Sequence, residues 1–255
     1  MPTPPSSPLY SHDFYGDQAP GSERSAQVVL PIVFELRPPG SMVDVGCGIG
    51  TWAHTAQALG VPRVVGVDGE YAQAAGLLIA AESFVAADLA TAGPALTERF
   101  DLAISLEVAE HLPATRADEF VTTLCLLADV VLFSAAIPGQ LGTDHITLQP
   151  QGEWAERFGS HGYQAFDLVR PRVWHDDRVE AFYRQNAIVY VNSQRPELLE
   201  RATALAAALP TVLDVVHPDL LAFWVRRATR PVSTSQGIAL TWRAARRAFA
   251  RRVGR

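Results

Sequence analysis

The chain has 255 residues and a formal net charge of −6, with 48% hydrophobic and 19% charged residues. This length and composition fit one large domain with appendages, and they exclude an intrinsically disordered protein. Two cysteines are too few for a disulfide framework or a structural zinc site, and no apolar run is long enough to span a membrane. The expected location is therefore the cytoplasm.

The charge is distributed unevenly along the chain. Residues 1–195 contain 11 arginines and 23 acids, a net charge of −12, whereas residues 196–255 contain 10 arginines and 4 acids, a net charge of +6. The first residues lack the charged and apolar regions of a signal peptide. The predicted organisation is a flexible leader (1–14), an acidic domain (15–193) and a helical, arginine-rich extension (194–255).

Apolar segments alternate with helical patterns, which predicts an α/β doubly wound sheet. In chain order, strands are expected at residues 41–45, 63–67, 83–86, 100–105, 130–134, 164–168 and 187–191. Helices are expected at residues 27–36, 51–59, 70–80, 117–127, 151–160 and 196–215.

The most informative segment follows the first predicted strand, where Asp44 and Val45 lead into Gly46-Cys47-Gly48-Ile49-Gly50. Glycines at alternate positions let backbone amides approach a ligand closely at the start of a helix. The spacing differs from the dinucleotide fingerprint G-x-G-x-x-G, because Thr51 stands where that pattern requires glycine. An acid two residues before the first glycine suits a cationic amino-acid group. The loop therefore predicts S-adenosylmethionine as the cofactor rather than NAD.

Two further acids stand at the ends of predicted strands. Asp68 lies 22 residues after Gly46, where a carboxylate can accept hydrogen bonds from both ribose hydroxyls. Asp88 follows the third predicted strand and could accept a hydrogen bond from the adenine amino group. Because ligands of doubly wound sheets bind beyond the carboxyl ends of the strands, Asp44, Asp68 and Asp88 are expected at one edge.

In these residues the chain resembles the class I S-adenosylmethionine-dependent methyltransferases. Residues 43–50 resemble their first motif, and residues 66–69 resemble their ribose-binding strand end. The resemblance covers about residues 10–193 and implies a Rossmann-like sheet of seven strands, mostly parallel with an antiparallel last strand. The cofactor contacts that it implies or suggests, including a flap before the first strand, are Tyr15, Ser25, Asp44, Gly46, Gly48, Asp68, Asp88 and Glu107.

A second group of polar side chains follows the fourth predicted strand, in the segment Glu107-Val108-Ala109-Glu110-His111. One helical turn would place Glu107, Glu110 and His111 on one face. His145 lies in the loop after the fifth predicted strand and is expected on the same edge. Carboxylates suit Mg²⁺ or Mn²⁺, whereas two imidazoles favour Mn²⁺, Fe²⁺ or Zn²⁺. The four side chains are therefore candidate ligands of a divalent cation.

The Glu-x-x-Glu-His segment resembles that of two groups of metal-dependent O-methyltransferases, the ubiquinone-biosynthesis enzymes and the small-RNA 3′-terminal 2′-O-methyltransferases. The RNA enzymes add a later histidine before a tryptophan-containing helix, much as His145 precedes Trp154 here. The resemblance implies that Glu107, Glu110, His111 and His145 hold the metal, Mg²⁺ or Mn²⁺. The alternative is a structural role, since metal-free methyltransferases also carry this segment.

A bound cation would lower the pKa of a coordinated hydroxyl and orient it toward the methyl donor. If His145 is not a ligand, it is the leading general base, because a free imidazole titrates near neutrality. The candidate catalytic residues are therefore His145, Glu107 and His111.

Polar and aromatic residues crowd the stretch 170–186 between the last two predicted strands, a pattern typical of an acceptor pocket or of a structural cap. The stretch resembles that of bacterial methyltransferases linked to glycan and secondary-metabolite pathways, which implies a sugar-like acceptor. The candidate substrate contacts are Asp144, Trp174, Tyr183, Arg184 and Asn186.

The leading hypothesis is an O-methyltransferase that acts on a hydroxyl of a saccharide or a sugar-bearing small molecule. The alternatives are an RNA 2′-O-methyltransferase, which the acidic body disfavours, a metal-independent small-molecule methyltransferase, and an inactive cofactor-binding scaffold, which the four candidate ligands disfavour. After Asp219 the chain contains no acid, and as a helix the C-terminus would be cationic and amphipathic, able to touch an anionic membrane, nucleic acid or an acidic partner. A solvated or packed extension is the alternative for that segment. Oligomerisation is left open.

Overall fold

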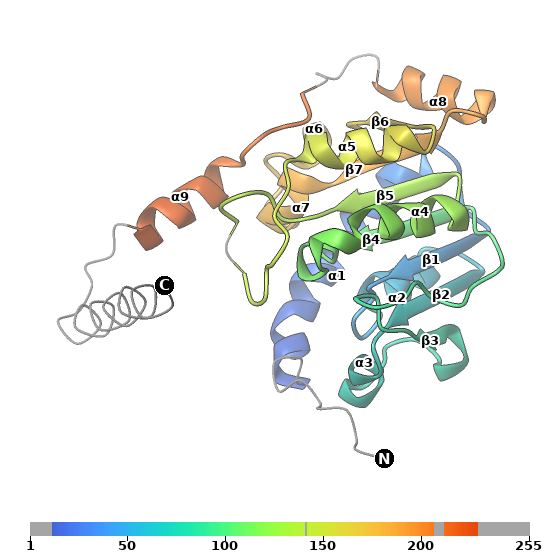
Figure 1. Cartoon of the computed structure of the whole chain (residues 1–255), viewed down its shortest axis with the longest axis horizontal. Helices are drawn as coiled ribbons and strands as arrows, with labels where there is room; N and C mark the ends of the chain where they lie inside the picture. Colours follow the sequence, from blue (N-terminus) through green and yellow to red (C-terminus); the bar gives the residue numbers. More distant parts are fainter. Residues whose placement is uncertain (1–11, 141, 207–211, 229–255) are drawn as a thin grey trace, which may run out of the picture. The chain divides into compact units, whose positions relative to one another are not determined.

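The computed structural model describes residues 12–140, 142–206 and 212–228, although the side chains of residues 12–18 and 227–228 lie outside the description. One seven-stranded sheet, in the order β3-β2-β1-β4-β5-β7-β6, organises the described chain (Figure 1). The strands are β1 (Ser41–Val45), β2 (Arg63–Asp68), β3 (Phe84–Ala86), β4 (Leu102–Leu106), β5 (Val130–Ser134), β6 (Tyr163–Phe166) and β7 (Ile188–Asn192).

Strand pairing confirms the predicted fold class. β1 pairs in parallel with both β2 and β4, and β4 pairs in parallel with β5. Only β7 is reversed, because it pairs antiparallel with both β5 and β6. The strand order changes direction between β1 and β4, and such a switch point opens a ligand site beyond the carboxyl ends of the neighbouring strands.

Helices cover both faces of the sheet (Figure 1). On one face, α4 and α5 share a core with the sheet, in which Trp154 and Phe158 of α5 pack against Phe133. On the other face, α1, α2, α6, α7 and α8 share a second core with residues such as Met42 and Ile104. The helices are α1 (His12–Phe34), α2 (Thr51–Ala58), α3 (Glu70–Ala75), α4 (Ala117–Leu127), α5 (Gln151–Ser160), α6 (Arg170–Val173), α7 (Ala181–Asn186), α8 (Pro196–Ala206) and α9 (Pro218–Ala228).

Helices α1 and α3 differ in length from the sequence-based prediction by five residues or more. The lead-in helix α1 begins at His12 and not at residue 27, and it packs along α2. Helix α3 ends at Ala75 because Gly76 adopts a φ of +96°, which breaks the helical backbone five residues before the predicted end. The leader expected at 1–14 falls largely on residues outside the described part of the chain.

The helix predicted at 196–215 is shorter than expected. Its first part, α8, buries Leu198 and Ala202 in the core of the domain, so the predicted boundary at 194 does not separate α8 from the sheet. Residues 212–217 lie outside any helix. Their carbonyl groups accept hydrogen bonds from a buried side chain instead: Arg170 donates to the carbonyl oxygens of Val212 and Leu213. These bonds hold the segment extended against the domain.

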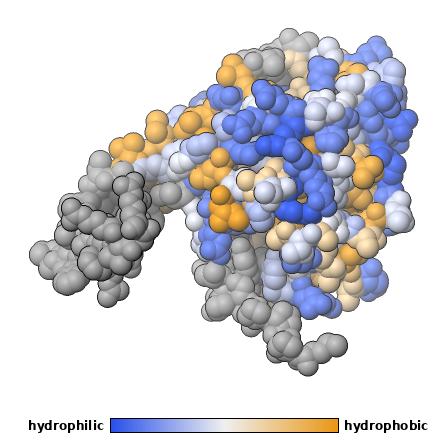
Figure 2. Space-filling view, in the orientation of Figure 1, coloured by the Kyte–Doolittle hydropathy of each residue, from blue (hydrophilic) through white to orange (hydrophobic). Residues whose placement is uncertain are grey.

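A second unit begins at Leu221. Its described part is the rest of α9, where Leu221, Phe223 and Val225 are each about half exposed. Hydrophobic residues are visible along α9, whereas hydrophilic residues predominate on the visible face of the first unit (Figure 2). The arginine-rich segment after residue 228 lies outside the described residues, so its predicted membrane contact stays a prediction. Within the described residues, no helix is long and apolar enough to cross a membrane.

Replacing Arg170 with alanine is expected to lower the free energy of unfolding by about 3–5 kcal/mol, because it leaves a buried carboxylate without its partner. Arg170 is 1% exposed and donates two hydrogen bonds to Asp167, at 3.0 and 2.8 Å. Chemical denaturation would measure the loss. The control is Arg178→Ala, which removes an exposed partner of Asp176 and should change little. Equal stability of the two variants would contradict this role of Arg170.

Candidate functional site

The glycine loop lies between β1 and α2, at the carboxyl edge of the sheet. Gly46, Gly48 and Gly50 adopt φ angles of +87°, +54° and +87°, a region that other residues rarely enter. A Cβ atom on Gly46 would lie 2.3 Å from Cγ2 of Val108. The amide of Gly46 donates to the carbonyl oxygen of Val67 at 2.7 Å, which ties the loop to β2. The loop is therefore closely packed and specifically requires glycine.

Asp44 is a buried acid directly beneath this loop. Its side chain is 3% exposed, and Oδ2 has no hydrogen-bond partner. Burial, together with repulsion from Asp68, raises the pKa of Asp44 to about 8. A buried carboxyl without a counter-charge is costly when ionised. Asp44 therefore suits a cationic ligand that would supply the missing charge.

Asp68 ends β2 and binds the same loop. Its Oδ2 accepts a hydrogen bond from the amide of Gly48 at 2.7 Å, and its Oδ1 accepts one from the amide of Gly69 at 2.6 Å. Burial raises the pKa of Asp68, while hydrogen bonds from Tyr71 and the two amides oppose that rise. The structure thus brings Asp44, Asp68 and the loop together. The ribose contact of Asp68 stays a prediction.

Asp88 lies in an exposed turn after β3. Its carboxylate accepts hydrogen bonds from the amide of Ala90 at 3.1 Å and the hydroxyl of Thr91 at 3.0 Å. These bonds stabilise the turn. The predicted adenine contact is not tested by them and stays a prediction.

The two candidate flap residues both lie on α1. Ser25 is fully buried; its hydroxyl donates to the carbonyl of Gly21 at 2.7 Å and accepts from the amide of Glu180 at 3.0 Å. These bonds connect α1 to the start of α7. The side chain of Tyr15 lies outside the described part of the structure, and the cofactor contacts of both residues stay predictions.

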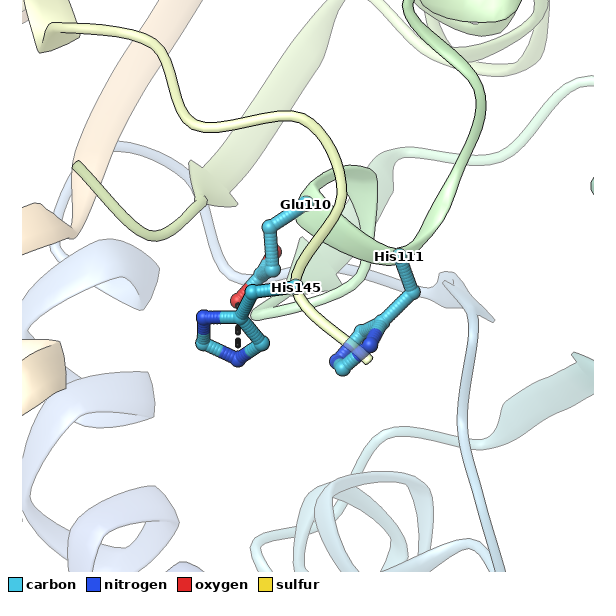
Figure 3. Close-up of side chains that lie close together, drawn as sticks. All are labelled: Glu110, His111 and His145. Carbon is cyan, nitrogen blue, oxygen red and sulfur yellow. Dashed lines mark ion pairs between the residues drawn. The ribbon is translucent and has the colours of Figure 1, made fainter. Parts of the chain in front are cut away.

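A candidate metal centre is formed by Glu110, His111 and His145, whose ligand atoms all lie within 4.8 Å of one another (Figure 3). Glu110 and His111 belong to a three-residue 3₁₀ helix, Ala109–His111, that follows β4. His145 comes from the loop after β5. The amides of Ile146 and Thr147 donate to the carbonyl oxygen of Glu110, at 2.8 and 3.0 Å, and hold the two segments together.

Glu110 is the most deeply buried member of the cluster. Its side chain is fully buried, and neither carboxylate oxygen has a hydrogen-bond partner. Burial and the neighbouring Glu107 raise the pKa of Glu110 well above its usual range. Nε2 of His145 lies 4.0 Å from Oε1 of Glu110 (Figure 3). The carboxylate therefore lacks a compensating charge.

Both histidines offer a nitrogen lone pair. Nδ1 of His145 lies 3.0 Å from the carbonyl oxygen of Gln140, which can only accept, so this hydrogen bond requires a proton on Nδ1 and leaves the lone pair of a neutral ring on Nε2. Nδ1 of His111 is buried without a partner. Burial and the nearby His145, with ring centroids 5.0 Å apart, lower the pKa of His111 and favour the neutral ring. Neutral imidazoles are the form that binds metals.

Glu107 lies beside this centre but is not among its three clustered ligands. Its Oε2 accepts a hydrogen bond from Nε2 of Gln140 at 2.7 Å, and its Oε1 accepts one from Nδ2 of Asn186 at 3.0 Å. Its backbone adopts a φ of +56°, and its amide donates to the carbonyl of Ser134 at 3.0 Å. Burial raises its pKa, and these amide donors oppose the rise. The single helical face predicted for the three residues does not form, because β4 ends and the backbone turns at Glu107.

The predicted substrate residues fall into an exposed group and a buried group. Asp144 is exposed beside the metal centre and adopts a φ of +55°, and Trp174 is partly exposed. Tyr183, Arg184 and Asn186 are buried in α7. Their acceptor contacts stay predictions.

The buried members of that group already have partners within the chain. The hydroxyl of Tyr183 lies 3.3 Å from Nε1 of Trp52, and burial raises its pKa. Arg184 donates to Asp219 at 2.9 Å. Asn186 bonds to Glu107 and to three glutamines. These contacts position α7 behind the site.

Sequence reasoning missed Gln140 and Gln185, two glutamines that support the candidate site. Nε2 of Gln185, which is fully buried, donates to Oε1 of Gln140 at 3.1 Å. Gln140 lies in the loop after β5, five residues before His145. A glutamine in a loop carries no motif, so only the contacts in the structure identify it.

Comparison with known proteins is consistent with this geometry. Residues 18–134 match the family model described as a methyltransferase domain. That range contains the glycine loop, Asp68, Asp88 and the segment from Glu107 to His111, but not His145. None of the curated proteins matches the chain in sequence.

Several solved structures share the fold. DesVI from Streptomyces venezuelae is 14% identical over 75% of this chain and 100% of its own, with a TM-score of 0.54. The sugar N-methyltransferase KedS8 from Streptoalloteichus sp. ATCC 53650 is 18% identical over 66% of this chain and 86% of its own, with a TM-score of 0.51. The plantazolicin methyltransferase BpumL, in complex with SAH, is 14% identical over 74% of this chain and 91% of its own, with a TM-score of 0.51. At these identities the likeness shows the fold alone.

Binding of a cationic ligand beside Asp44 is expected to release about one proton at pH 7, because the free carboxyl is protonated below its pKa and the complex requires it ionised. Affinity should therefore rise with pH up to about 8, the pKa of Asp44. Calorimetry of S-adenosylmethionine in buffers of different ionisation enthalpy would measure the release.

In that experiment Asp44→Asn should abolish the proton release and weaken binding. Asp118→Asn is the control, since it changes an exposed carboxylate on α4. Buffer-independent enthalpies for the unsubstituted protein would contradict the role of Asp44.

Proposed function

We propose that this S-adenosylmethionine-dependent methyltransferase transfers a methyl group to a hydroxyl of a saccharide or a sugar-bearing small molecule, with the help of a divalent cation. The methyltransferase activity itself rests on the domain match across residues 18–134 and on the doubly wound fold with its glycine loop. The acceptor, the metal and the position methylated are the parts that we add.

One observation carries the metal assignment. Glu110 is buried with both oxygens unpartnered, and ring nitrogens of His111 and His145 lie within 4.8 Å of its carboxylate. A fully buried carboxylate in such surroundings requires a compensating cation or a proton. The donor set of one carboxylate and two imidazoles fits Mn²⁺, Fe²⁺ or Zn²⁺ better than Mg²⁺. We therefore assign Glu110, His111 and His145 as the residues that would hold the cation.

A bound cation would supply the activation that an aliphatic hydroxyl needs, by lowering the pKa of a coordinated oxygen. The chain itself supplies the rest. The glycine loop brings backbone amides to the methyl donor, and Asp44 supplies a negative charge for its ammonium group. The proton on Nδ1 of His145 leaves Nε2 as a lone-pair donor. In the metal-free alternative, that nitrogen accepts the hydroxyl proton directly.

The saccharide acceptor is supported by chemistry and not by close relatives. Two adjacent hydroxyls of a sugar can chelate one cation, which would place both next to the methyl donor. One structure of similar fold, KedS8, is a sugar N-methyltransferase. An RNA 3′ end offers the same pair of hydroxyls, but residues 1–195 carry a net charge of −12, whereas RNA requires a basic surface.

Replacing Glu110 with glutamine or His145 with alanine is expected to lower methyl transfer by at least about 100-fold, because each removes a ligand of the cation. The affinity for S-adenosylmethionine should change less than about threefold, since Asp44 and the glycine loop are untouched. Transfer of labelled methyl to a panel of sugars, sugar-bearing metabolites and RNA ends would measure activity, and calorimetry would measure cofactor binding. Glu153→Gln, an exposed residue of α5, is the control.

A chelator separates the two versions of the mechanism. Loss of transfer in chelator and recovery with one divalent metal would support the assigned centre. Full transfer in chelator would contradict it, and a concurrent loss in His145→Ala would then identify His145 as the base. Transfer to RNA ends alone would overturn the saccharide acceptor.

A further inference from the structure

Gln140 connects the two residues that flank the candidate metal centre. Its side-chain Nε2 donates to Oε2 of Glu107 at 2.7 Å. Its backbone carbonyl accepts a hydrogen bond from Nδ1 of His145 at 3.0 Å. One residue therefore contacts Glu107 through its side chain and His145 through its main chain.

The orientation of the Gln140 carboxamide is fixed from behind. Its Oε1 accepts hydrogen bonds from Nε2 of Gln185 at 3.1 Å and from Nδ2 of Asn186 at 3.0 Å. Both donors are buried, with exposures of 0% and 2%. If the Gln140 carboxamide were flipped, its NH₂ group would point at the N–H donors of Gln185 and Asn186. Its oxygen would then point at the Glu107 carboxylate. The side chains of Gln140, Gln185 and Asn186 are buried, so each of their polar groups left unpaired would cost about 1–3 kcal/mol.

The network is anchored at its far end by the extended segment after α8. The amide of His217 donates to Oε1 of Gln185 at 2.8 Å, and Nε2 of Gln151 donates to the carbonyl of Val215 at 3.2 Å. Gln185 therefore cannot rotate without losing a bond to that segment. The network runs without interruption from residue 217 to the candidate centre.

We propose that Gln140 is a positioning residue, which holds the Glu107 carboxylate in place and fixes His145 with its proton on Nδ1, so that the neutral ring keeps its lone pair on Nε2, the atom 4.0 Å from Oε1 of Glu110. The inference rests on the proposed function in one respect, that Nε2 of His145 serves as ligand or base. The tautomer of a neutral histidine is set by the hydrogen bond that its other nitrogen makes. In His145 the other nitrogen is Nδ1, and its acceptor is the backbone carbonyl of Gln140. The side-chain hydrogen bonds of Gln140 hold this carbonyl in place.

Replacing Gln140 with methionine tests the proposal, because methionine keeps the length and volume of the side chain but makes none of its three hydrogen bonds. Nitrogen-15 and carbon-13 shifts of labelled histidine report the tautomer, and His145→Ala identifies the His145 signal among the seven histidines. We expect His145 to carry its proton on Nδ1 in the unsubstituted protein. In Gln140→Met the form protonated on Nε2 should increase about fivefold or more.

Activity provides a second measurement. Gln140→Met is expected to lower kcat at least about tenfold, because misplaced groups lose the reactive geometry. The KM for S-adenosylmethionine should stay within about twofold, since the network does not reach the glycine loop. Gln164→Ala, an exposed glutamine of β6, is the matched control and should change neither measurement. Melting temperatures verify that each variant is folded.

A second variant keeps the test decisive if Gln140→Met does not fold. Gln140→Glu still accepts from Gln185 and Asn186 but cannot donate to Glu107 in its ionised form, and we expect the same shift in tautomer and the same loss in kcat. An unchanged tautomer and an unchanged kcat in the folded variant would overturn the proposal. Failure of the proposed function would look different: the unsubstituted protein would methylate no hydroxyl, while the tautomer of His145 would still respond to Gln140.

Discussion

Buried carboxyl groups at the carboxyl edge of the sheet are the constraint on which the rest of the structure depends. Asp44, Asp68 and Glu110 are all less than 10% exposed, and burial raises the pKa of each. Elsewhere in the described part of the chain, a buried carboxylate is paired with arginine, as Asp167 is with Arg170. The edge is therefore built to receive positive charge from its ligands, which matches a sulfonium donor bearing an ammonium group and a divalent cation.

The two candidate cation sites are built differently, and each construction suits its ligand. Around Asp44 the backbone is the main element, because the neighbouring loop contains glycines with positive φ, of which Gly46 packs closely against Val108. Around Glu110 side chains dominate, and the imidazoles of His111 and His145 bring ring nitrogens within 4.8 Å of the carboxylate. Glu107 lies next to Glu110, and amide groups hold its carboxylate. The scaffold thus places the predicted cofactor residues and the candidate metal ligands at separate positions along a single edge.

Local patterns predicted much of the fold. The bounds of β1, α4, β5 and α5 agree with the prediction at every residue, because each has a clear apolar period and ends at a turn signal. The bounds of α1 and α3 were wrong. Tertiary packing along α2 extends the first of these helices, and the backbone of Gly76 ends the second. Within the described residues, the helix expected at 196–215 forms only in its first part, α8, whereas Arg170 and Gln151 bind carbonyl groups of residues 212, 213 and 215.

By itself, the sequence determined the glycine loop, the strand-end acids and the meeting of Glu110, His111 and His145, since parallel strands deliver their carboxyl ends to one edge. Only the tertiary structure decided that Glu107 binds amide groups beside the metal cluster, that the buried residues of α7 have internal partners, and that Gln140 supports His145. The physical reason is that hydrogen bonds between side chains distant in sequence depend on packing and on the turn at Glu107, and no local pattern encodes either.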